Sequence, residues 1–207
     1  MRKRGAGILL LTAGATLLAL VGCVHSSGDP VAAISDARIA AAYIPLYRGS
    51  FMSQAEGAAT VIAPGFAVTN AHNANLLGGV TILGSPKDYD LLFFGTDRQS
   101  VPVTGVPRLG ERVIAYGQGK DRDLRIARGV VRQLPATGSD YFIFEGNAGP
   151  GFSGGPVIDE ADGRLLGIVY GYKDAEKGGQ PMIYAYDIAR VRSLFSTLQK
   201  GLPVDVN

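Results

Sequence analysis

One serine of this 207-residue chain is surrounded by glycine and proline. Ser153 lies in the segment Gly-Pro-Gly-Phe-Ser-Gly-Gly-Pro-Val at residues 149–157, between apolar runs at 141–144 and 165–170. Glycine adopts backbone conformations that other residues avoid, so a tight turn here can project the hydroxyl while neighbouring N–H groups point into one pocket. This arrangement is typical of a nucleophilic serine beside an oxyanion hole, although a Gly-rich turn between two strands has the same composition.

A serine hydroxyl is a poor nucleophile unless a neighbouring base takes its proton, and that base needs a carboxylate to orient it. The chain contains two histidines. His72 ends an apolar run that begins at Ala67, whereas His25 lies two residues after the single cysteine, close to the N-terminus. His72 is therefore the candidate base.

Two aspartates are candidates for the carboxylate. Asp88 and Asp90 both precede the apolar run at residues 91–94. Asp88 follows Pro86 and Lys87 in what reads as a turn, where an aspartate is normally solvated. From the residues alone, both aspartates remain possible partners of the base.

The three segments stand in the order His, Asp, Ser, and each resembles a motif of the trypsin-like, chymotrypsin-fold serine peptidases. Thr-Asn-Ala-His at 69–72 resembles the strand end that carries the family's histidine, and Asp-Leu-Leu-Phe at 90–93 resembles the strand start that carries its aspartate. Residues 151–156 follow the family pattern Gly-Xaa-Ser-Gly-Gly-Pro. The resemblance extends from about residue 58 to residue 195.

This resemblance assigns roles to single residues. It implies a catalytic triad of His72, Asp90 and Ser153, with Asp90 preferred to Asp88 because the family places its aspartate directly before this strand. The backbone N–H groups of Gly151 and Ser153 would form the oxyanion hole. His72 and Asp90 are closer in sequence than in the animal enzymes, which implies a compact first barrel.

Family spacing also implies a primary substrate pocket with Asn147 at its base and Gly171, Tyr172 and Met182 on its walls. No acidic residue lies at the implied floor, which argues against a preference for Arg or Lys. The side chains of Tyr172 and Met182 imply a shallow pocket that takes a small or medium apolar residue.

The elements that must position these residues read as antiparallel sheet. Short runs rich in Val, Ile, Tyr and Phe alternate with Gly, Pro, Asp and Asn. Residues 109–117, 128–131 and 163–169 resemble strands of the bacterial branch that contains the heat-shock-type periplasmic proteases. We expect an all-β peptidase domain over residues 41–201, built from two six-stranded-type antiparallel β-barrels that share a cleft. The compact first barrel would cover about 41–104 and the second about 109–186.

The last part of the chain has the pattern of an amphipathic helix. Asp187 precedes apolar residues at helical spacing up to Leu198, and Gly201 closes the run. An N-capping aspartate and a terminal glycine predict a helix over residues 187–200. We expect no peptide-binding PDZ module of the kind found in the heat-shock branch, so substrate choice would depend on the cleft itself.

Residues 1–22 read as a secretory signal, because three basic residues precede an apolar stretch that is short and contains glycine. Leu-Val-Gly-Cys at residues 20–23 resembles the bacterial lipobox, in which the cysteine thiol is diacylated, the preceding peptide is removed and the new amino group is often acylated. Cys23 would then be the lipid attachment site. An ordinary signal peptide with an incidental cysteine is the alternative.

A small, polar segment follows Cys23, and we expect a tether over residues 23–40. The protein would be exported and lipid-anchored to the bacterial cell envelope, on its periplasmic or surface side. The formal net charge of the whole chain is +2, and removal of residues 1–22 takes away three basic residues and no acid. The mature chain is therefore slightly acidic, and we expect no nucleic-acid partner. Two histidines and one cysteine, scattered, also predict no metal site, and no cofactor motif is present.

These features predict a membrane-anchored serine endopeptidase that hydrolyses peptide bonds through an acyl-enzyme, with a protein or peptide as substrate. Two other functions fit the same sequence. A catalytically silent member of the fold would use its cleft or barrel surface as a binding module. A structural envelope lipoprotein would carry the serine motif incidentally.

Overall fold

A computed structural model describes residues 28–50, 53–136, 139–175 and 179–201 of the chain. The predicted signal peptide and Cys23 lie outside the described residues. Within the described part of the chain, no helix has the length and apolar character needed to cross a membrane.

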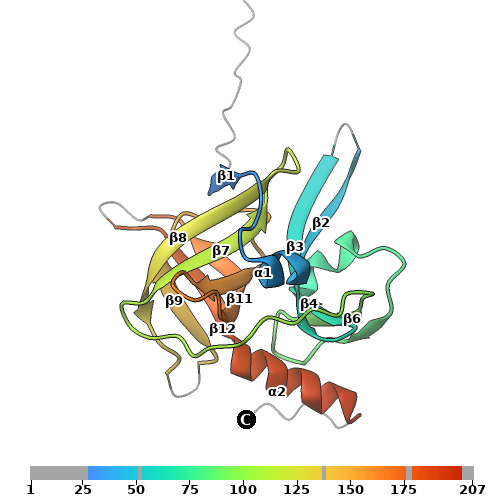
Figure 1. The fold of residues 1–207 in the computed structure, drawn as a ribbon. Helices are drawn as coiled ribbons and strands as arrows, with labels where there is room; N and C mark the ends of the chain where they lie inside the picture. The colour runs from blue at the N-terminus through green and yellow to red at the C-terminus, as the bar shows by residue number, and fades with distance from the viewer. Residues whose placement is uncertain (1–27, 51–52, 137–138, 176–178, 202–207) are drawn as a thin grey trace, which may run out of the picture.

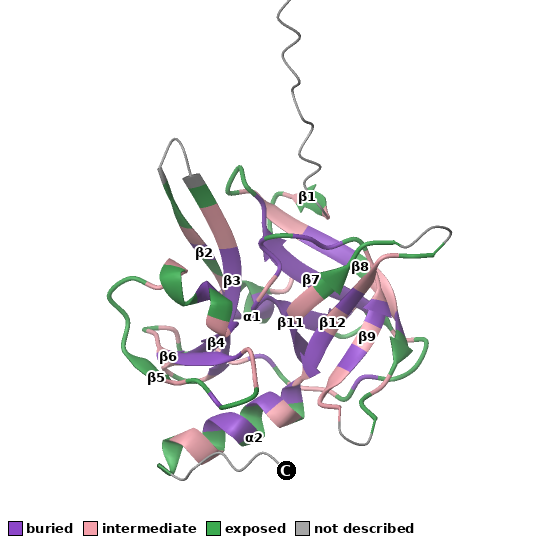
Figure 2. Ribbon diagram, turned by 180° about the vertical axis from the view of Figure 1, so that it is seen from behind, coloured by how far each residue is buried: buried purple, intermediate pink, exposed green. Residues whose placement is uncertain are grey.

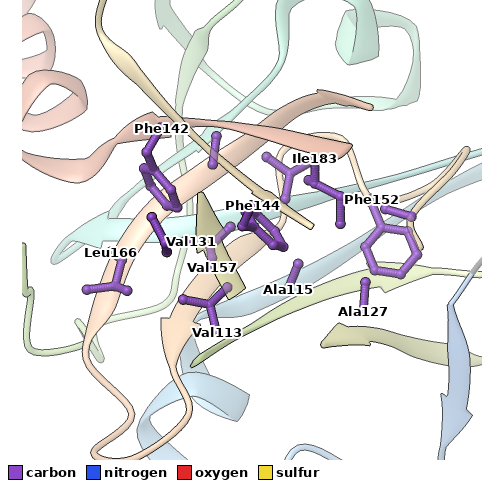
Figure 3. Close-up of a cluster of buried hydrophobic side chains, with 13 residues drawn as sticks. Val113, Ala115, Ala127, Val131, Phe142, Phe144, Phe152, Val157, Leu166 and Ile183 are labelled. Carbon is purple, nitrogen blue, oxygen red and sulfur yellow. The ribbon is translucent and has the colours of Figure 1, made fainter. Parts of the chain in front are cut away.

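The second half of the chain forms a closed barrel of six antiparallel strands, and closure comes from pairing between β8 and β9 (Figure 1). Going round the barrel, the strands are β7 (Arg112–Gln118), β10 (Pro156–Asp159), β11 (Leu165–Lys173), β12 (Met182–Asp187), β9 (Tyr141–Glu145) and β8 (Leu124–Gln133). Alternating residues of these strands point inward, and Phe142 and Phe144 of β9 are fully buried among aliphatic side chains from the other strands (Figure 3).

The first half forms a separate antiparallel sheet with the strand order β2-β3-β4-β6-β5. Its strands are β2 (Tyr43–Ser50), β3 (Ser53–Ala63), β4 (Phe66–Thr69), β5 (Ile82–Gly84) and β6 (Leu92–Gly95), with the 3-10 helix η1 (Ala71–Leu76) after β4. The expected fold class, mostly β with two antiparallel units and a C-terminal helix, is confirmed. The first unit is smaller than a six-stranded barrel: it has five strands, and no pairing within the described residues closes it.

Helix α2 (Ile188–Gln199) begins at the predicted cap, where Asp187 Oδ1 accepts a hydrogen bond of 2.7 Å from the N–H of Ala189. Figures 1 and 2 show this helix along one end of the molecule, below the first sheet. Its buried residues belong to one hydrophobic cluster that also contains residues of both halves of the chain. The first half contributes Ile62, Val68, Leu91 and Phe93, and the second half contributes Leu165, Ile168 and Tyr186. The helix therefore holds the two sheets together on this side.

The predicted tether over residues 23–40 is wrong from Asp29 onward. Strand β1 (Asp29–Val31) pairs antiparallel with β8, with Asp29 opposite Ile126, and the short helix α1 (Ala37–Ala42) follows it. The polar composition hid this structure because the pairing of β1 uses backbone groups. Only a few apolar side chains attach the segment to the core, and among them Ile39 is fully buried.

Candidate active site

His72 and Asp90 lie together because the strands beside them are neighbours. His72 belongs to η1, which begins two residues after β4, and Asp90 lies two residues before β6. Strands β4 and β6 are antiparallel, with Thr69 opposite Leu92. The end of one strand and the start of the other therefore meet at one edge of the first sheet, although 18 positions separate the two residues.

Asp90 binds His72 at two points. Its Oδ2 lies 2.6 Å from His72 Nδ1, and its Oδ1 accepts a hydrogen bond of 3.0 Å from the backbone N–H of His72. An ionised carboxylate only accepts hydrogen bonds, so Nδ1 carries the ring hydrogen and Nε2 of the neutral ring is left as the acceptor. This is the tautomer that a general base needs.

The carboxylate itself is held in its charged form. Burial raises the pKa of Asp90, but the hydrogen bonds from His72 outweigh burial, and the pKa lies below the ordinary value. The backbone of Asp90 is fixed as well: its C=O accepts a 2.7 Å bond from Asn70 Nδ2, and its N–H donates to Tyr186 Oη at 3.2 Å. Asp90 is thereby tied to both sheets.

The structure places Asp88 differently. Asp88 is exposed in a turn and has a left-handed backbone, with φ 68°. Among the described residues it makes no hydrogen bond to His72. Of the two candidate aspartates, the structure brings only Asp90 to the base.

Ser153 lies on a turn of the second barrel that only glycine can build at two positions. Gly151 and Gly154 have φ of 91° and 85°, in the left-handed region. A Cβ on Gly151 would lie 1.7 Å from Gln118 O, and one on Gly154 would lie 2.1 Å from Ala58 O. The turn is thus pressed against the backbone of both sheets, which places Ser153 at the boundary between them.

The predicted oxyanion donors are available in this turn. The N–H groups of Phe152, Gly154 and Gly155 donate to carbonyl groups of the protein. Within the described residues, the N–H groups of Gly151 and Ser153 have no such acceptor. Backbone N–H groups that bind no protein acceptor are free to serve as the donors of an oxyanion hole.

A cleft of about 500 Å³ brings these groups together. It is lined by Gln54, Ala55, Glu56, His72, Asn73, Asn75, Leu76, Lys120, Pro150, Gly151, Ser153 and Tyr172. The Ser153 hydroxyl has no hydrogen-bond partner among the described residues, and catalytic hydrogen bonds of this kind often form only with substrate bound.

The predicted substrate pocket is only partly seen in this cleft. Tyr172 lines it, and its side chain is exposed. Asn147, Gly171 and Met182 are not among its lining residues; Asn147 is exposed, and Met182 lies opposite Lys173 in the β11–β12 pair. Their assignment to a pocket remains a prediction.

Three polar residues around the site were not predicted. Asn70 and Tyr186 hold the backbone of Asp90, and Asn73 binds the carbonyl group of Ser153 at 3.0 Å. Asn70 and Asn73 lie within two residues of His72, so their presence beside the candidate base was visible in the sequence, but their burial and their partners were not. Tyr186 is 96 positions from Asp90, and no local pattern connects the two.

Two β units that share a cleft, with a bonded His-Asp pair on one and a glycine-framed serine on the other, define the class of the trypsin-like peptidases. The chain belongs to the trypsin-like peptidase domain family, whose model matches residues 49–168. A search among curated proteins found no match.

Solved structures share the fold at low sequence identity. The serine endoprotease from Yersinia pestis is 18% identical over 79% of this chain, with a TM-score of 0.65, and the HtrA-type protease AlgW with a tripeptide is 22% identical over 80%, with a TM-score of 0.62. The chain spans 64% and 62% of the lengths of these two proteins. The Rv3671c protease in its inactive form is 20% identical, with a TM-score of 0.55, over 70% of this chain and 84% of its own.

Proposed function

We propose that the protein is a serine endopeptidase that hydrolyses peptide bonds through an acyl-enzyme. The observation that carries the proposal is that His72, bonded to Asp90 at 2.6 Å, lines the same cleft as Ser153. Membership of the trypsin-like peptidase domain family supports it. The unpaired N–H groups of Gly151 and Ser153 supply the charge stabilisation that such a reaction needs.

Each step of the reaction uses one of these groups. His72 Nε2 takes the proton of Ser153 as its Oγ attacks the carbonyl carbon, and Asp90 stabilises the resulting imidazolium. The N–H groups of Gly151 and Ser153 donate hydrogen bonds to the carbonyl oxygen and stabilise the negative charge that forms on it. His72 then returns the proton to the leaving amine, and an ester on Ser153 remains. Water, activated by the same histidine, hydrolyses this ester and frees the serine.

A peptide is the proposed substrate because the cleft is open and mixed in character. It contains the apolar Leu76, the aromatic ring of Tyr172 and two opposite charges, Glu56 and Lys120. AlgW, which shares the fold, was solved with a tripeptide. An extended chain with both apolar and polar side chains fits such a surface better than a small, uniformly apolar ligand does.

Labelling with a fluorophosphonate tests the proposal directly, because only an activated serine attacks the probe's phosphorus and displaces fluoride. We expect the full-length protein to be labelled and Ser153→Ala to lose all labelling, with turnover reduced by up to about a million-fold as in other triads. Ser196→Ala, on the exposed face of α2, is the matched control and should label normally. An unlabelled wild type would instead favour the silent binding module.

We also propose that the protein is lipid-anchored to the bacterial cell envelope through Cys23. The support is the lipobox-like sequence at residues 20–23 and the basic and apolar segment before it. The folded domain begins at Asp29, so at most about 20 Å of extended chain separates it from Cys23. The cleft would therefore work close to the membrane surface.

Intact-mass measurement of the protein from membranes tests the anchor. We expect a chain that begins at Cys23 and carries two or three acyl groups. Cys23→Ser should remove the lipid mass and either block cleavage at this site or release the protein from membranes. An unmodified Cys23, or cleavage elsewhere, would contradict the proposal.

A further inference from the structure

The side chain of Asn73 closes a ring of hydrogen bonds across the two sheets. Asn73 follows His72 in η1 and is 4% exposed. Its amide Nδ2 donates to Ser153 O at 3.0 Å and to Thr69 Oγ1 at 3.0 Å. The Thr69 hydroxyl donates to Ala58 O at 2.7 Å, and the N–H of Ala58 donates to Ser153 O at 2.9 Å. Both amide hydrogens of Asn73 are thereby used.

Glycines make room for this ring on both sides. A Cβ on Gly57 would lie 2.8 Å from Asn73 Nδ2, and one on Gly154 would lie 2.4 Å from Thr69 Oγ1. Both distances are shorter than real carbon contacts, so any larger residue would displace a member of the ring. The positions of Asn73 and Thr69 are consequently set by close packing as well as by hydrogen bonds.

His72 and Ser153 belong to different sheets, and something must fix one relative to the other. The bonds from Asp90 orient His72 within the first sheet, but they do not reach the turn that carries Ser153. The amide of Asn73 does reach it, from the residue next to His72. A shift of about 1 Å between reacting groups can reduce turnover by about a hundredfold.

We propose that Asn73 is a positioning residue for catalysis, which sets the base against the nucleophile through the carbonyl group of Ser153. The inference rests on the proposed peptidase function. Asn73 itself touches no reacting atom. Its loss should therefore reduce kcat with little effect on the binding of substrate, because Asn73 is only 4% exposed, the other lining residues of the cleft stay in place and the His72–Asp90 pair remains.

Two variants of Asn73 separate its hydrogen bond from its volume. Asn73→Leu keeps a side chain of similar size with no donor, and Asn73→Asp keeps the shape but presents an acceptor to Ser153 O. For both, we expect kcat to fall by about 10- to 100-fold with KM within about threefold, and fluorophosphonate labelling to slow by the same factor. If one variant fails to fold, the other carries the test.

Thr60→Val is the matched control. Thr60 is fully buried on β3, and its hydroxyl donates to Gly154 O at 3.0 Å, so the variant removes one buried hydrogen bond from the same turn. Thr60 is not adjacent to the base. We expect a drop in Tm comparable to that of the Asn73 variants, but a loss of kcat below about threefold, because the position of His72 relative to Ser153 is preserved.

Three results would overturn the role of Asn73. Wild-type kcat in a folded Asn73→Leu or Asn73→Asp variant would show that the bond to Ser153 O is not needed. An equal loss in Thr60→Val would show that anchoring of the turn matters generally, not the link to His72. A wild type that neither turns over peptides nor labels would overturn the peptidase function, and this role with it.

Discussion

The Asp90 carboxylate accepts hydrogen bonds from both the ring and the backbone N–H of His72, and these two contacts define the orientation of the imidazole. A single bond to Nδ1 would leave the ring free to tilt about that contact. The second bond ties the carboxylate to the start of η1, so rotation of the Asp90 side chain would break two bonds at once. Replacing one oxygen atom of the Asp90 side chain is therefore enough to alter the geometry of the site.

Asp90→Asn tests this dependence with a change of one atom. An amide at this position donates as well as accepts, so it can stabilise the wrong histidine tautomer, in which Nδ1 is the acceptor. We expect a loss of about four orders of magnitude in kcat with the fold retained. Steady-state kinetics on a peptide substrate and a thermal melt provide the measurement.

Asp88→Asn is the paired control for that experiment. Asp88 is exposed at φ 68°, and asparagine tolerates the left-handed region well. The variant should keep both kcat and Tm close to those of the wild type. If Asp88→Asn were inactive and Asp90→Asn kept full activity, Asp88 would be the carboxylate partner of His72.

The serine, histidine and aspartate candidates could be proposed from the sequence because each stands in a short local motif. Their supporting bonds could not. Tyr186 and the carbonyl of Ser153 reach their partners only because strands far apart in sequence become neighbours. A pattern within ten residues carries no information about such contacts, so the polar shell of the site needed the structure.

At the scale of elements, α2 connects the two sheets that carry the site. Phe195 packs between two rings of the first sheet, with its centroid 5.2 Å from that of Phe66 and 5.6 Å from that of Phe93. Residues of the second barrel, among them Ile168, belong to the same buried cluster. The helix thus stabilises the relative position of the two halves.

Phe195→Ala should accordingly destabilise the whole domain. Removal of a buried phenylalanine leaves a cavity, and we expect a loss of about 3–5 kcal/mol in the free energy of unfolding. Urea unfolding followed by circular dichroism measures it. Ser193→Ala, on the exposed face of the same helix, should change stability by no more than about 0.5 kcal/mol. Equal stability of the two variants would mean that α2 adds little to the core.

Most strands and the C-terminal helix could be predicted because their apolar runs and caps are local signals. Two features could not. Strand β1 pairs through its backbone, so its polar sequence reads as a linker. The first sheet has five strands and no closing pair among the described residues, and local composition does not show which strands become neighbours.

At the scale of the whole molecule, the start of the described chain, Gly28 and strand β1 (called the N-terminal segment below), lies against the turn that carries Ser153. Phe152, between the two proposed oxyanion donors, is fully buried and forms one end of the barrel core (Figure 3). A Cβ on Gly28 would lie 2.6 Å from Phe152 Cζ, and one on Gly117 would lie 2.5 Å from its Cγ. Arg125 Nη1 donates to Gly28 O at 3.1 Å and holds the segment in place. The ring is therefore enclosed between the N-terminal segment and β7.

Gly28→Ala should disturb this enclosure, since the new methyl group meets a ring that Gly117 prevents from retreating. We expect a loss of about 1–3 kcal/mol in stability from overpacking, in addition to the strain of a left-handed alanine, and slower fluorophosphonate labelling because Phe152 moves with Gly151 and Ser153. Gly110→Ala provides the control: its φ of 78° nearly equals the 77° of Gly28, but a Cβ there meets nothing within 4 Å. Urea unfolding and labelling rates measure both variants. Equal effects in the two would show that backbone strain alone is responsible and that the N-terminal segment does not support the turn.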